Sequence, residues 1–141
     1  MSAQDNAKIA KASYEAFNNR EFEQWAAAYL TDEAATVNVP LNVTFHGPDG
    51  YSQFSQGWVT AFPDGKVEIT KMVAGDEGVA TEFRGRGTHT GPLVGPAGEI
   101  PATGRSIDVP FCQIMQIKNG KVVSSRLYFD AATMMGQLGL I

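Results

Sequence analysis

The stretch IKNGKVV, residues 117–123, places Asn119-Gly120 between two runs of alternating apolar and polar residues. Asn-Gly is the strongest short-range signal for a two-residue β-hairpin, because both central residues of a type I′ turn need a positive φ. We therefore predict two antiparallel strands joined at this turn, with Lys118 opposite Lys121.

The turn also sets a register for the two strands. If the register continues without a break, Gln113 faces Arg126 and Phe111 faces Tyr128. Successive side chains of a strand point to opposite faces of the sheet. This register predicts a polar row on one face that contains Gln113, Arg126 and Tyr128 and ends at Asp130.

Upstream of the hairpin, apolar residues at spacings of three and four predict three helices. These residues are Ala7, Ala10, Tyr14 and Phe17 in the first helix, Phe22, Trp25, Ala26 and Tyr29 in the second, and Phe54, Trp58 and Phe62 in the third. The third helix would lie between the turns GPDG and FPDG. Residues 34–39 predict a strand that Pro40 ends, because proline cannot donate to a ladder.

The second half of the chain favours strands. The runs KVEITKMV (66–73) and VATEFRGRGTH (79–89) predict an antiparallel pair. Four Gly and three Pro between Thr90 and Gly104 indicate a long loop, either the mouth or lid of a pocket or a plain connection. Helices followed by strands and a short last helix predict an α+β domain over 1–141, with helices on one face of a curved, mostly antiparallel sheet.

Composition excludes several classes of protein. A chain of 141 residues with 43% hydrophobic content suffices for one domain with a core. The net charge of −4, without a run of Lys or Arg, argues against a nucleic-acid partner. No apolar run approaches the roughly 20 residues of a membrane span, so we expect a cytoplasmic protein without a membrane partner. One Cys and two His give little support for a metal site.

Three stretches of the second half resemble one known family. AFPDGKVEI (61–69), RGRGTHTGPLVGPAGEIPATGR (84–105) and NGKVVSSRLYFDAATMMGQLGL (119–140) closely resemble the SnoaL-like polyketide cyclases, also called ester cyclases, of the NTF2-like superfamily. The most specific parts are GTHTG, PATGR and the Asp before QLGL. The resemblance implies an NTF2-like α+β cone with a deep apolar pocket, a homodimer, and no cofactor.

The resemblance also implies a function for Asp130. In this family an Asp at the corresponding place is the acid/base of an intramolecular aldol closure. The residues themselves offer a second interpretation, because Asp130 stands directly before AATMMGQLG and would cap the last helix. One carboxylate oxygen can cap the helix while the other faces a substrate, so the two functions are compatible.

Further candidates for the site come from the predicted faces. Gln113 and His89 are candidate catalytic residues, because a hydrogen-bond donor stabilises a developing enolate oxygen; His89 could instead hold the long loop. Arg126 and Tyr128 would orient the substrate, and a buried Arg126 would need a partner, either an anionic ligand group or a glutamate. Apolar contacts with the substrate are expected from Tyr14, Trp58, Phe62, Phe111 and Met115, each of which could equally be a core residue.

The predicted function is therefore a cofactor-free acid/base enzyme acting on a small, largely apolar carbonyl compound. Its most concrete version is the aldol-type cyclisation of a polyketide-like ester. A noncatalytic module that binds a hydrophobic ligand in the same cone is the alternative, and an epoxide hydrolase ranks lower because no second carboxylate accompanies Asp130. The steroid isomerases of the same superfamily have a general-base Asp directly before a Pro in the first strand and an oxyanion-hole Tyr on the first helix. Here Val39 precedes Pro40, and Tyr14 is one residue away from the corresponding position. Steroid isomerisation is therefore disfavoured.

Overall fold

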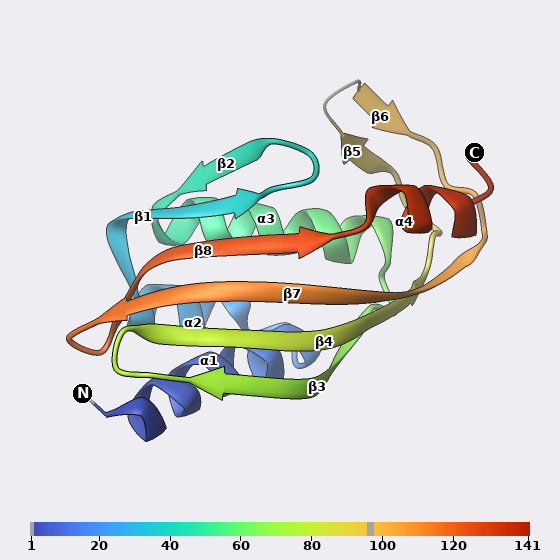
Figure 1. The fold of residues 1–141 in the computed structure, drawn as a ribbon. Coiled ribbons are helices and arrows are strands. Elements are labelled where there is room, and N and C mark those ends of the chain that lie inside the picture. Colours follow the sequence, from blue (N-terminus) through green and yellow to red (C-terminus); the bar gives the residue numbers. More distant parts are fainter. Residues whose placement is uncertain (1, 96–97) are drawn as a thin grey trace.

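The computed structural model describes residues 2–95 and 98–141, and Figure 1 shows its helices and strands. The helices are α1 (Ala3–Asn18), α2 (Phe22–Tyr29), α3 (Gly47–Ala61) and α4 (Ala131–Gln137). The strands are β1 (Leu30–Asn38), β2 (Val43–His46), β3 (Lys66–Ala74), β4 (Gly78–Thr88), β5 (Leu93–Gly95), β6 (Gly98–Ile100), β7 (Ser106–Lys118) and β8 (Lys121–Phe129).

The main sheet has six strands in the order β2-β1-β8-β7-β4-β3. Its pairs are antiparallel except for β1 and β8, which are parallel. Helices α1, α2 and α3 cover one face of the sheet, and α4 follows its last strand (Figure 1). The predicted α+β class, with N-terminal helices, a curved and mostly antiparallel sheet and a short last helix, is confirmed.

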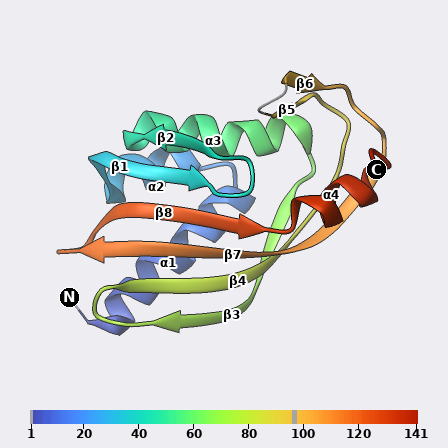
Figure 2. The ribbon, with the colours of Figure 1, turned by 45° about the horizontal axis from the view of Figure 1, so that its top comes forward.

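Two segments that were predicted as a turn and a loop form regular structure instead. The GPDG segment is not a turn before the third helix but the first turn of α3, with a proline at the helix start, where its missing N–H costs nothing. The stretch predicted as a loop over 90–104 contains β5 and β6, although residues 96–97 of it lie outside the described part of the chain. Figure 2 shows this hairpin standing beyond the end of α3.

The hairpin turn was predicted correctly, but the register was not. Asn119 and Gly120 have φ values of 52° and 74°, and Lys118 pairs with Lys121. The register then shifts between Gln116 and Ile117, so that Gln116 pairs with Ser124. An extra residue in one strand turns all later side chains to the other face.

The shift overturns the predicted polar row. Gln113 lies opposite Leu127, whereas Arg126 lies opposite Ile114 and Tyr128 lies opposite Cys112. Arg126 and Tyr128 are exposed on the outer face of the sheet, away from the helices. Gln113 is buried on the inner face. The predicted grouping of these three side chains is therefore wrong.

The outer face carries ion pairs and exposed apolar side chains. Arg84 and Arg86 both pair with Asp108, at 2.7 and 3.3 Å. Ile114 is 44% exposed on the same face. The homodimer stays a prediction.

The core lies between the helices and the inner face of the sheet, in two clusters. The first is centred on α2 and contains Ile9, Trp25, Leu30, Tyr51, Met115, Ile117 and Val122, among others. The second contains Tyr14, Phe62, Phe83, Phe111, Leu127, Met134 and Leu138, among others. Within the described residues, no helix combines the length and apolar character that crossing a membrane requires.

Candidate functional site

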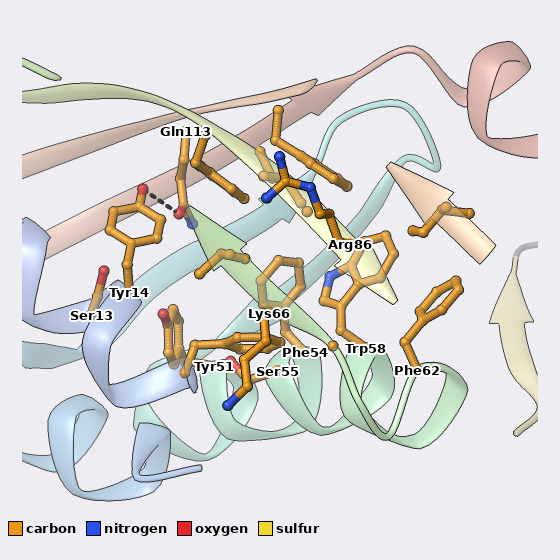
Figure 3. Close-up of a pocket in the computed structure, with 18 residues that line it drawn as sticks. Ser13, Tyr14, Tyr51, Phe54, Ser55, Trp58, Phe62, Lys66, Arg86 and Gln113 are labelled. Carbon is orange, nitrogen blue, oxygen red and sulfur yellow. Dashed lines mark hydrogen bonds between the residues drawn. The ribbon is translucent and has the colours of Figure 1, made fainter. Parts of the chain in front are cut away.

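A cavity of about 80 Å³ lies between the helices and the inner face of the sheet. Side chains from α1, α3, β3, β4, β7 and β8 line it, and Figure 3 shows them converging from the helices and the strands. Eight of its eighteen lining residues are aromatic: Tyr14, Phe17, Tyr51, Phe54, Trp58, Phe62, Phe83 and Phe111. The cavity therefore favours an apolar ligand that packs against rings.

Buried polar side chains of α1, β7 and β8 form one polar end of the cavity, and its wall contains three further buried polar residues, Ser13, Tyr51 and Ser55. The Tyr14 hydroxyl donates to Oε1 of Gln113 at 2.8 Å (Figure 3), and Nε2 of Gln113 donates to Oγ of Ser125 at 2.7 Å. All three side chains are at most 5% exposed. Burial raises the pKa of Tyr14 well above its usual value, so the phenol stays a neutral donor. We call these three residues the Tyr14–Gln113–Ser125 chain.

The charged residues that line the cavity are Lys66 and Arg86. Both are exposed, which places them on the solvent side. Nζ of Lys66 donates to the carbonyl of Asn18 at 2.8 Å, and Arg86 pairs with Glu68 as well as Asp108. No Asp or Glu is among the described residues of the wall. The interior is therefore neutral, with hydrogen-bonding groups but no carboxylate.

Asp130 caps α4. Its Oδ1 accepts from the backbone N–H of Ala132 at 3.0 Å and of Thr133 at 3.4 Å, and its Oδ2 accepts from the Thr133 hydroxyl at 2.8 Å. These bonds, the Thr133 hydroxyl foremost, lower the pKa of Asp130. The side chain is exposed and satisfies free N–H groups of the helix start, so the carboxylate does not lie in an apolar environment that would raise its pKa. Its catalytic function stays a prediction.

His89 is completely buried and holds the segment that follows β6. The Thr103 N–H donates to Nδ1 of His89 at 3.2 Å, so the neutral ring carries its proton on Nε2. Among the described residues Nε2 has no hydrogen-bond partner, and burial lowers the pKa of His89. The ring packs against Phe62, 5.4 Å between centroids, but does not line the cavity. These contacts agree with the interpretation that His89 holds the long loop. A catalytic function of His89 stays a prediction.

The other predicted residues fall into two groups. Tyr14, Trp58, Phe62, Phe111 and Gln113 all line the cavity. The second group consists of Met115, which packs in the first core cluster, and Arg126 and Tyr128, which lie on the outer face.

On the outer face, the side chains of Arg126 and Tyr128 interact with each other. Nε of Arg126 donates to the Tyr128 hydroxyl at 3.0 Å, and its guanidinium lies 5.8 Å from the centre of that ring. The predicted partners of Arg126, a glutamate or an anionic ligand group, are therefore not needed to explain its position.

Sequence reasoning missed Tyr51 and Ser55 of the wall, and Ser125 of the polar end. Tyr51 lies within the predicted third helix, three residues before Phe54, so an extension of the spacing of Phe54, Trp58 and Phe62 would have found it. No group of three or more His, Cys, Asp or Glu among the described residues is placed to hold a metal ion.

A curved sheet and N-terminal helices around an apolar cavity define the class of NTF2-like proteins. The family model of SnoaL-like polyketide cyclases matches residues 7–138. The chain therefore belongs to the SnoaL-like polyketide cyclase family, as its sequence predicted. A comparison with curated proteins gave no match.

Solved structures share the architecture. A candidate SnoaL-like polyketide cyclase from Jannaschia sp. CCS1 is 17% identical, with a TM-score of 0.87 over 99% of this chain and 94% of that chain. TsrD from Streptomyces laurentii is 19% identical, with a TM-score of 0.83 over 100% and 99%. IdmH, a candidate polyketide cyclase from Streptomyces antibioticus, is 23% identical, with a TM-score of 0.77 over 95% and 98%. At these identities the likeness concerns the fold.

Proposed function

We propose that the chain binds a small, neutral, largely apolar molecule with a carbonyl group in the cavity between the helices and the sheet. One observation carries this proposal: an aromatic wall that ends at Tyr14 and Gln113, the two members of the buried Tyr14–Gln113–Ser125 chain that line the cavity. Burial of apolar ligand surface supplies the affinity, at about 25 cal/mol per Å². The polar end supplies the orientation.

The hydrogens at the polar end suit a carbonyl oxygen. Gln113 Nε2 carries two N–H groups, and one of them is directed at Ser125. The other is available to a ligand oxygen, and the Tyr14 hydroxyl can exchange its bond to Gln113 for one to the ligand. A charged ligand group would lose its hydration without meeting an opposite charge in the interior. The polar end therefore favours a neutral ketone or ester.

The volume of the cavity limits the size of the ligand. The cavity of about 80 Å³ corresponds to roughly five to eight water-sized volumes of 10–15 Å³. A compact molecule of about six non-hydrogen atoms fits this range. Cyclopentanone is such a molecule, and methylenecyclopentane has the same shape with a CH₂ group in place of the carbonyl oxygen.

We expect cyclopentanone to bind in the cavity, which NMR titration of the wall residues measures. In the double variant Tyr14→Phe/Gln113→Leu, the affinity for cyclopentanone relative to methylenecyclopentane should fall about two- to tenfold, the value of one net hydrogen bond. Tyr51→Phe is the matched control, because it removes another buried hydroxyl of the wall and should leave the ratio unchanged. If neither compound shifts the resonances of the wall residues, the proposal is wrong.

A second candidate function, aldol-type cyclisation with Asp130 as acid/base, is favoured by membership of the cyclase family. Asp130 would have to leave its cap and turn toward the cavity. The preceding Phe129 packs against Phe111 and Trp58 of the wall, with centroids 5.0 and 5.7 Å apart, so Asp130 directly follows a residue that contacts the wall. Gln113, and His89 if it reaches the substrate, would then stabilise the enolate oxygen.

Asp130→Asn separates capping from catalysis, because Asn caps a helix about as well as Asp. If Asp130 is the acid/base, the variant keeps its thermal stability and loses turnover of a polyketide-like ester, followed by chromatography of the cyclised product. Asp130→Ala serves as the control that loses the cap as well. An undiminished rate of Asp130→Asn on a confirmed substrate would contradict the catalytic function, and recovery of unchanged ligand from the wild type would favour binding alone.

A further inference from the structure

We propose that Trp58 determines the length of the ligand, because it divides one elongated binding space into the cavity and an outer groove. The inference rests on the proposed binding of a neutral carbonyl compound in the cavity. It adds that the Trp58 ring limits the wild type to ligands about as long as the cavity. A longer ketone would place its ketone ring in the cavity and extend its far end into the groove only when this ring is removed.

The groove is large and adjoins the cavity. It measures about 1230 Å³ and lies between α3, the β1–β2 pair and β5 (Figure 2). Apolar side chains, among them Leu41, Phe45 and Leu93, line it together with polar ones such as Asn38 and Gln53. Its acidic residues are Glu23, Asp49 and Glu99. Phe54 and Trp58, one turn apart on α3, line both the groove and the cavity. One helix face therefore forms the wall between the two spaces.

Trp58 is the part of this wall that crosses from the helix to the sheet. Its ring meets Phe111 of β7 edge-on at 5.8 Å and Phe129 of β8 at 5.7 Å between centroids. Figure 3 shows the indole extending from α3 into the space between helix and sheet. Removal of this ring would join the groove and the cavity.

The contacts of Trp58 also leave it free to move. The other tryptophan, Trp25, is 5% exposed and donates its indole N–H to the carbonyl of Ile9 at 3.1 Å. Trp58 is only partly buried, and its indole forms no side-chain hydrogen bond with the described residues. Its contacts are with rings, which a ligand ring can replace. Displacement of Trp58 thus breaks no polar interaction.

Gly57 supports the same interpretation from the groove side. It stands in the interior of α3 and lines the groove, although glycine is a poor residue in a helix. A Cβ added at Gly57 would meet nothing within 4 Å, so packing does not require a glycine there. The absence of a side chain leaves the groove open beside Trp58.

The inference is tested with three ketones that grow by one ring: cyclopentanone, indanone and the naphthalene-fused cyclopentanone. Affinities are measured by calorimetry for the wild type, Trp58→Ala and Trp58→Leu. We expect Trp58→Ala to bind the longest ketone about tenfold or more tightly than the wild type, because the ring it admits buries further apolar surface. Cyclopentanone should not gain affinity and should bind more weakly in Trp58→Ala, because it loses its contact with the Trp58 ring. The ratio of the affinities for the longest ketone and for cyclopentanone therefore measures the effect. Trp58→Leu should shift affinities in the same direction and keeps the test valid if Trp58→Ala does not fold.

A second substitution tests where the far end of the ligand lies. Gly57→Leu in the Trp58→Ala background should reverse the gain for the longest ketone and leave cyclopentanone unaffected, with Gly57→Ala in that background as the matched control. If cyclopentanone binds but the longest ketone gains nothing in Trp58→Ala and Trp58→Leu, the inference is overturned while the proposed function stands. A gain that Gly57→Leu fails to reverse overturns the placement in the groove. If cyclopentanone binds to none of the proteins, the proposed function itself fails.

Discussion

Phe111→Ala is expected to lower the free energy of unfolding by about 3–5 kcal/mol, the usual cost of truncating a buried aromatic ring. Phe111 is 7% exposed, stacks on Phe83 with centroids 5.2 Å apart, and contacts Phe129 at 5.0 Å. Because it already borders a cavity, the space left by the ring joins that cavity. The enlarged cavity is harder for the surrounding rings to fill by relaxation, and the cost of a truncation rises with the volume that stays empty. The upper part of the range is therefore expected.

Urea unfolding measures this loss as a lower midpoint at an unchanged slope. The matched control is Ile114→Ala on the same strand, because Ile114 lies on the outer face and is 44% exposed. A surface truncation of this kind changes the free energy of unfolding by about 0.5 kcal/mol or little more. Similar losses in the two variants would mean that the faces of β7 are assigned wrongly.

The faces of β7 could be predicted from the sequence, and those of β8 could not. The alternation along β7 places Phe111, Gln113 and Met115 on one face, which is the buried inner face of the structure. In β8 the residues after Lys121 are Val, Val, Ser and Ser, a sequence that favours neither parity. The register shift occurs among these residues. Because these residues do not alternate between apolar and polar, the sequence gives no sign of the shift at this point. The later run RLYF does, since its apolar Leu127 belongs on the inner face of the sheet and the unshifted register would place it on the outer face.

The site depends on contacts that no local pattern records. Tyr14 and Gln113 were both predicted as site residues, but they are 99 positions apart and meet because α1 packs across the sheet. Asp130 was ambiguous for a different reason. A residue that follows a strand and precedes a helix has the right chemistry for a cap and for an acid/base, and only the direction of its side chain separates the two. In the structure the nearby N–H groups of α4 and the Thr133 hydroxyl set that direction.

Gln113→Leu is expected to lower the free energy of unfolding by about 1–3 kcal/mol for each buried group that it leaves without a partner. The groups concerned are the Tyr14 hydroxyl, which loses its acceptor, and Ser125 Oγ, which loses its donor. Urea unfolding again gives the measurement, and Gln116→Leu is the matched control, because Gln116 is an exposed glutamine of the same strand. A loss no larger than that of the control would contradict the buried position of the chain.

The triple variant Tyr14→Phe/Gln113→Leu/Ser125→Ala removes all three polar groups of the chain together. No partner is then left unsatisfied, and such replacements are close to neutral for stability. We therefore expect the triple variant to regain most of what Gln113→Leu loses, while it no longer prefers cyclopentanone over methylenecyclopentane. Regained stability together with a lost preference for cyclopentanone would show that the polar end serves ligand recognition. If the triple variant were instead less stable than Gln113→Leu alone, the chain would act as a stabilising part of the core, and the orientation of a ligand carbonyl would need another donor.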